Sequence, residues 1–85
     1  MEMNELRSRI DAIDSQMVDL YKQRMDAVSE IGEYKRANKL PIYDSERERN
    51  LLNNVGEQAG AEYESGVRAM FQTIMESSRA YQQHK

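Results

Sequence analysis

The spacing of apolar residues in the first half of the chain is typical of one long helix. They recur at alternating steps of four and three residues, at Leu6, Ile10, Ile13, Met17 and Leu20. This period places them on one helix face, and the stripe resumes at Ala27, Val28, Ile31 and Tyr34. Pro41 ends the helix, because the residue before a proline is disfavoured in the α region. We predict a first helix over about residues 5–38, with Asn4 as its N-cap.

Two shorter helices are predicted in the second half. Ser45 and Glu48 have the spacing of a capping box, with Asp44 as the alternative first residue, and a helix over about 45–56 follows. Glycines at 56 and 60 mark the next break. A third helix over about 62–83 carries the apolar residues Val67, Met70, Phe71, Ile74, Met75 and Tyr81. The chain therefore reads as all-α, with one domain over residues 1–85.

Composition narrows the classes of function. The chain has no cysteine, and its one histidine is His84 near the C-terminus, which excludes thiolate chemistry and argues against histidine catalysis or a metal site. The net charge of −3 argues against nucleic-acid binding. No apolar run approaches the roughly 20 residues of a membrane span, and Met1 opens no signal peptide. We expect a cytoplasmic protein that uses no cofactor.

The length of the first helix predicts a partner. About 34 residues at ~1.5 Å per residue give ~51 Å, whereas a compact chain of this size has a radius of gyration of about 12 Å. The apolar stripe must therefore be buried on another copy or on another protein. Because so short a chain usually needs a metal, disulfides or a second subunit, oligomerisation is expected.

Polar residues interrupt the apolar faces of all three predicted helices. Helical periodicity assigns six of them to inward-facing positions: Arg24, Lys35, Ser78, Gln82, Arg47 and Glu48. For any one of them, a side chain that reaches solvent is the more common arrangement. Together they indicate a site in a helix bundle, and the excess of cations indicates an anionic ligand, since arginine binds carboxylates bidentately. Arg49 and Arg79 look like residues of a solvated face.

The order and spacing of these residues resemble the all-helical chorismate mutases, which convert chorismate to prephenate. The matching segments are Leu6-Arg7-x-x-Ile10-Asp11-x-Ile13-Asp14, Arg24, Gly32-x-x-Lys35, Pro41-x-x-Asp44-x-x-Arg47-Glu48-Arg49 and Phe71-x-x-Ile74-Met75-x-x-Ser78-x-x-x-Gln82. The resemblance implies an intertwined, antiparallel homodimer of three-helix chains. It also implies an isomerase of phenylalanine and tyrosine biosynthesis that needs no metal.

The resemblance assigns a role to each polar residue. It implies that Lys35 and Gln82 donate to the ether oxygen of the breaking bond, and that Glu48 accepts from the ring hydroxyl. The implied substrate-binding residues are Arg7, Arg24, Arg47, Asp44 and Ser78. Arg7 and Arg24 are 17 residues apart, roughly 25 Å along a helix, so one small ligand cannot touch both on one straight helix. If Arg7 joins the site, it must come from an antiparallel partner.

Several alternatives stay open at this point. An isochorismate–pyruvate lyase shares this scaffold, a non-catalytic dimerisation or regulatory module has the same helices, and the chain could be the mutase domain of a bifunctional enzyme. Gly32 marks either a close approach or a tolerated weak point in its helix. The apolar segment Pro41-Ile42-Tyr43 either covers the site or, more commonly, packs over the end of the first helix.

Overall fold

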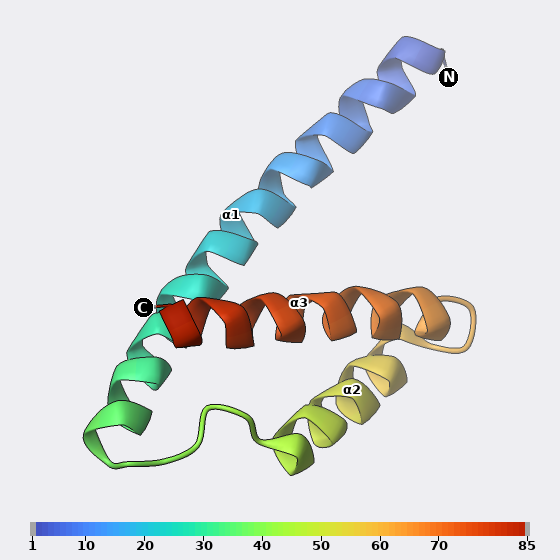
Figure 1. Cartoon of the computed structure of the whole chain (residues 1–85). Helices are drawn as coiled ribbons and strands as arrows, with labels where there is room; N and C mark the ends of the chain where they lie inside the picture. The colour runs from blue at the N-terminus through green and yellow to red at the C-terminus, as the bar shows by residue number, and fades with distance from the viewer. Residues whose placement is uncertain (1, 85) are drawn as a thin grey trace.

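Three helices make up the computed structural model, which describes residues 2–84 of the backbone and the side chains of residues 2–83. They are α1 (Met3–Ala37), α2 (Ser45–Ala59) and α3 (Glu64–His84). Within these residues there is no strand, so the prediction of an all-α chain with one very long first helix is confirmed. Helix α3 packs against both α1 and α2, and its C-terminal end lies on the second half of α1 (Figure 1).

The predicted start of the second helix at residue 45 is confirmed, whereas the predicted cap of the first helix and the predicted capping box of the second were wrong. Helix α1 begins at Met3 with Glu2 in the N-cap position and no side-chain cap, so Asn4 lies inside the helix. At α2, Asp44 is the N-cap, and its Oδ1 accepts a 3.0 Å hydrogen bond from Arg47 N. With Asp44 as the N-cap, the third residue of the helix is Arg47 rather than Glu48, so Glu48 is not part of a capping box. Its carboxylate turns instead toward α3.

The ends of the first two helices follow from backbone conformation. Lys39 has φ +57°, and Leu40 N donates to Lys35 O over 2.8 Å, which closes α1 before Pro41. Helix α2 runs past the predicted end at residue 56, because Gly56 keeps helical geometry and is buried beside Arg68. The chain leaves the helix only at Gly60, whose φ of +80° suits glycine.

The core is small and lies where α3 crosses α1. The buried apolar side chains are Met25, Val28 and Met75. By contrast, every described side chain from residue 2 to residue 23 is exposed, with Ile10 at 56% and Leu20 at 61%. The N-terminal half of α1 projects alone from a molecule of 54 × 27 × 15 Å (Figure 1). Its apolar stripe is therefore not covered by its own chain.

None of the helices in the described part of the chain combines the length and the apolar character that a membrane span requires.

Candidate active site

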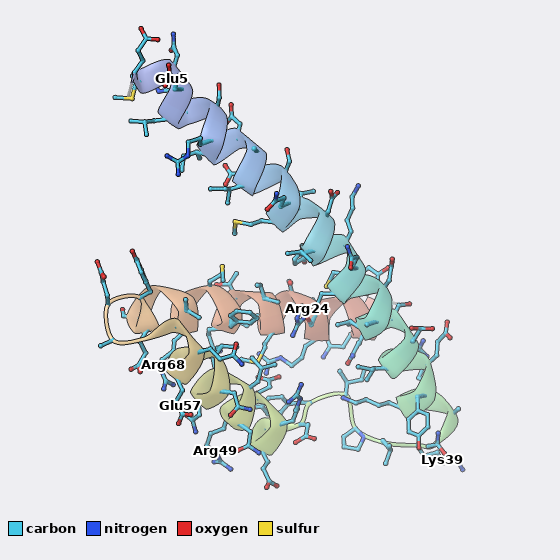
Figure 2. The ribbon with its side chains drawn as sticks, turned by 180° about the vertical axis from the view of Figure 1, so that it is seen from behind. Glu5, Arg24, Lys39, Arg49, Glu57 and Arg68 are labelled. Atoms are coloured by element: carbon cyan, nitrogen blue, oxygen red, sulfur yellow. The ribbon has the colours of Figure 1, made fainter. Side chains whose placement is uncertain are left out.

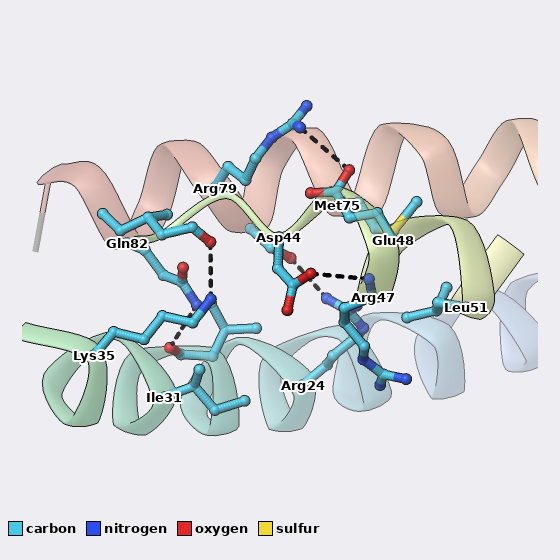
Figure 3. Close-up of a pocket in the computed structure, with 13 residues that line it drawn as sticks. Arg24, Ile31, Lys35, Asp44, Arg47, Glu48, Leu51, Met75, Arg79 and Gln82 are labelled. Atoms are coloured by element: carbon cyan, nitrogen blue, oxygen red, sulfur yellow. Dashed lines mark hydrogen bonds and ion pairs between the residues drawn. The ribbon is translucent and has the colours of Figure 1, made fainter. Parts of the chain in front are cut away.

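A cavity of about 240 Å³ lies between the second half of α1, the first turns of α2, the last turns of α3 and the loop that joins α1 to α2. Figure 3 shows the side chains that line it. They are Arg24, Val28, Ile31, Lys35, Ile42, Asp44, Arg47, Glu48, Leu51, Met75, Ser78, Arg79 and Gln82. Seven of the eight residues singled out by the sequence line this cavity; the eighth, Arg7, does not.

Arg24 and Ser78 join α1 to α3 at one end of the cavity. Arg24 lies at the crossing of these helices (Figure 2), and its Nη1 donates to Ser78 Oγ over 2.6 Å. Ser78 Oγ in turn donates to Ile74 O over 2.8 Å, which fixes the hydroxyl. Burial lowers the pKa of the Arg24 guanidinium, and repulsion from Arg47 lowers it further against an opposing effect of Tyr21. An anion bound between Arg24 and Arg47 would offset the repulsion between their guanidinium groups.

Lys35 and Gln82 lie together at the opposite end of the cavity (Figure 3). Lys35 Nζ donates to Ile42 O over 2.8 Å, and Gln82 Nε2 donates to Val28 O over 3.3 Å. Gln82 is 7% exposed. Both donors carry further hydrogens, so their backbone partners orient them without using up their capacity to donate.

Gly32 allows Gln82 to lie directly against α1. The residue is buried, and a methyl group there would lie 3.3 Å from Gln82 Cγ, closer than ordinary carbon–carbon contact. Of the two interpretations left open by the sequence, the structure supports close approach of another helix.

The interpretation of Arg79 as a solvated residue was wrong. Arg79 Nη1 lies 3.2 Å from Glu48 Oε1, and its guanidinium lies 4.6 Å from the centroid of the Tyr43 ring. The signal was present in the sequence, because Arg79 follows Met75 by four residues just as Ser78 follows Ile74. The loop borders the site, since Ile42 lines the cavity and Tyr43 stacks on Arg79, and it also contacts the last turn of α1 through the hydrogen bond from Lys35 to Ile42 O.

The cavity carries an excess of positive charge. Four cationic and two anionic side chains line it. Both carboxylates have partners, because Asp44 caps α2 and Glu48 pairs with Arg79. Among the described residues, Arg24, Lys35 and Arg47 are in no ion pair. The arrangement suits a small ligand with more than one negative group.

Arg7 lies outside the cavity of its own chain. It is on the projecting half of α1 and is exposed, near Glu5, which Figure 2 shows at the far end of the helix from the site. Its predicted role therefore depends on a second subunit and stays a prediction.

Comparison with known proteins identifies the family. The model of the family described as "Chorismate mutase type II" matches residues 6–83. A T-protein of Enterobacter agglomerans is 40% identical over 60 residues, which are 71% of this chain and 16% of that protein. A 4-amino-4-deoxychorismate mutase of Streptomyces pristinaespiralis is 33% identical over 57 residues, 67% of this chain and 44% of that one.

A solved structure extends the likeness to the fold. The conserved hypothetical protein from Pyrococcus furiosus superimposes with a TM-score of 0.79 at 35% identity, covering 94% of this chain and 93% of that one. The chain spans only about a sixth of the T-protein. The family match nevertheless covers nearly all of the chain, including the cavity residues from Arg24 to Gln82. This protein therefore belongs to the chorismate mutase type II family.

Proposed function

We propose that this chain is a chorismate mutase that converts chorismate to prephenate by a pericyclic rearrangement. The observation that carries the proposal is the convergence of Arg24, Arg47, Lys35 and Gln82 on one cavity. Their order in the sequence and the family match both agree with it.

The first task of the site is to hold a flexible dicarboxylate in a compact, chair-like shape. Arg24 and Arg47 supply guanidinium groups for the carboxylates, and the Ser78 hydroxyl keeps Arg24 in place over 2.6 Å. When the two reacting ends are held together, the substrate loses conformational entropy on binding and does not lose it again on the way to the transition state, so the barrier is lower. Glu48 accepts a hydrogen bond from the ring hydroxyl, beside the backbone at Asp44.

The second task is to stabilise the stretched ether bond. A C–O bond breaks while a C–C bond forms within one molecule, so every atom is retained and no proton has to move. Negative charge develops on the ether oxygen, and preorganised donors stabilise it. Lys35 and Gln82 are those donors, each oriented by a backbone carbonyl. Because the Gln82 amide is neutral, it donates at any pH near neutrality.

The active form is a homodimer of antiparallel chains. The exposed stripe on α1 supplies the surface, since Leu6, Ile10, Ile13, Met17 and Leu20 are all at least 41% exposed. A second, antiparallel α1 crossing near residues 17–20 would bury both stripes and place Arg7 of the partner subunit opposite the stretch from Arg24 to Lys35. The complete site then contains a third guanidinium for the dicarboxylate.

The first experiment is loss of chorismate absorbance with purified protein, with prephenate identified after acid conversion to phenylpyruvate. Wild-type protein and the control variant Arg49→Ala, which changes an exposed residue, should both be active. The activity of Arg24→Ala should be lower by a factor of at least about 100. No loss of chorismate in a folded, dimeric sample would refute the proposal. Release of pyruvate from isochorismate by that sample would instead establish the lyase, and inactivity on both would leave a binding module.

A mixing experiment tests the shared site. Arg7→Ala and Arg24→Ala proteins should each be inactive alone. When the two proteins are refolded together in equal amounts, half of the dimers contain one chain of each kind. Each mixed dimer has one intact site of two, so about a quarter of wild-type activity should return. No recovery, with mixed dimers shown by mass spectrometry of differently tagged chains, would contradict a contribution of Arg7 to the partner's site.

A further inference from the structure

We infer that Arg79 is a positioning and specificity residue, which holds Glu48 and makes the site prefer a ring hydroxyl to a ring ammonium. The inference rests on the proposed function, because it takes Glu48 as the group that faces the ring substituent of the substrate.

Contacts from two different elements hold the Arg79 guanidinium. Its Nη1 lies 3.2 Å from Glu48 Oε1 on α2, and its Cζ lies 4.6 Å from the centroid of the ring of the loop residue Tyr43. The side chains of Arg79 and Glu48 are only 27% and 18% exposed, so solvent screens the pair less than it would at an open surface. Arginine suits this place because its planar group both stacks on an aromatic ring and donates in a fixed direction.

This arrangement leaves Glu48 able to bind the substrate. A carboxylate has two oxygens and about four lone-pair sites, so Glu48 can accept a hydroxyl hydrogen while Arg79 donates to Oε1. Arg79 therefore fixes the direction from which the acceptor meets the ring. Without Arg79, Glu48 loses its only ion-pair partner among the described residues.

Arg79 also changes which substituent Glu48 favours. A ring hydroxyl is neutral, so it gains a hydrogen bond from Glu48 and feels little of the nearby guanidinium. An amino group on the same ring carbon is protonated at neutral pH and is repelled by Arg79 as it approaches Glu48. Chorismate and 4-amino-4-deoxychorismate differ at this one group, and they are the substrates named for two members of the comparison.

The test compares kcat/KM for these two compounds in wild type, Arg79→Gln and Arg79→Lys. Wild type should prefer chorismate. Arg79→Gln should raise the KM for chorismate and shift the ratio of kcat/KM values about tenfold toward the amino compound, since one charge a few ångströms away is removed. Arg79→Lys keeps the charge and should hold the ratio within about threefold of wild type. The control variant Arg49→Gln, which changes an exposed residue, should change neither the KM for chorismate nor the ratio of kcat/KM values.

A merely structural role for Arg79 predicts a different result. In that case Arg79→Gln would lower kcat/KM for both compounds by the same factor and leave their ratio unchanged, which would overturn the inference. Far-UV circular dichroism checks that each variant is folded, and Arg79→Met gives the same comparison if Arg79→Gln is not. Wild-type protein that converts neither compound would overturn the proposed function and this inference with it, whereas chorismate turnover with an unshifted ratio overturns this inference alone.

Discussion

Replacing Gly32 by alanine tests the contact between α1 and α3 that positions Gln82. The added methyl group would lie 3.3 Å from Gln82 Cγ and 3.6 Å from both Gln82 Cβ and Arg36 Nη1. Carbon atoms in good contact are about 3.5–4.0 Å apart, so Gln82 must move by a few tenths of an ångström. The hydrogen bond from Gln82 Nε2 to Val28 O is already 3.3 Å long, and this displacement weakens it.

The two effects of Gly32→Ala on stability nearly cancel, whereas its effect on kcat is not offset. Alanine is favoured over glycine inside a helix by about 1 kcal/mol, and a weakened hydrogen bond costs about 0.5–1.5 kcal/mol. The free energy of unfolding of Gly32→Ala should therefore stay within about 1 kcal/mol of wild type. Because a catalytic group misplaced by 1 Å costs about 100-fold, a shift of a few tenths of an ångström should lower kcat by about three- to tenfold.

Gly66→Ala is the matched control. Gly66 lies in α3, and nothing lies within 4 Å of the added methyl group, so this variant should gain helix propensity without a clash. Its melting temperature should rise by up to about 4–8 °C, with kcat unchanged. Thermal unfolding by circular dichroism and chorismate consumption at saturation measure both variants. If Gly32→Ala gains as much stability as Gly66→Ala and keeps its kcat, α1 and α3 do not approach closely at Gln82.

The remaining predictions concern the chemistry, the charge and the assembly. Lys35→Ala should lower kcat by about 100-fold with a smaller change in KM, because a donor to the ether oxygen acts mainly in the transition state; equal factors in steady-state kcat and KM would contradict that role. Wild-type activity should persist through neutral pH, since the guanidinium of Arg24 stays charged there despite its lowered pKa and Gln82 is neutral; a sharp optimum near about pH 5 would be inconsistent with amide donation. Arg24→Lys should instead lose activity as pH rises, because the same burial and the nearby Arg47 lower the pKa of an ammonium that begins at only about 10.4; a flat alkaline profile of that variant would show that the cation is not needed. Ile13→Asp should give an inactive monomer by size-exclusion chromatography with light scattering, since Ile13 lies on the exposed stripe; an active dimer would place the interface elsewhere.

Much of the site was predictable because helical periodicity assigns each residue to a face. Ser78 and Gln82 follow Ile74 at successive steps of four, and both are buried in the structure. The same rule applied to Met75 would have found Arg79. The N-cap of α2 was harder to predict, because Asp44 and Ser45 are both good N-cap residues. Only the hydrogen bond from Arg47 N to Asp44 Oδ1 decides between them.

Sequence alone determined that the chain is helical, that its first helix is too long to be covered by the rest, and that cationic and polar side chains interrupt the inward faces of the helices. These are consequences of short-range period, chain length and residue type. Only the tertiary structure decided that Arg79 meets Glu48 and Tyr43, that the loop carbonyl of Ile42 orients Lys35, and that Gly32 admits Gln82. Those contacts join residues on different elements, so they depend on where α3 crosses α1 and how the loop runs. Periodicity within one helix carries no information about either.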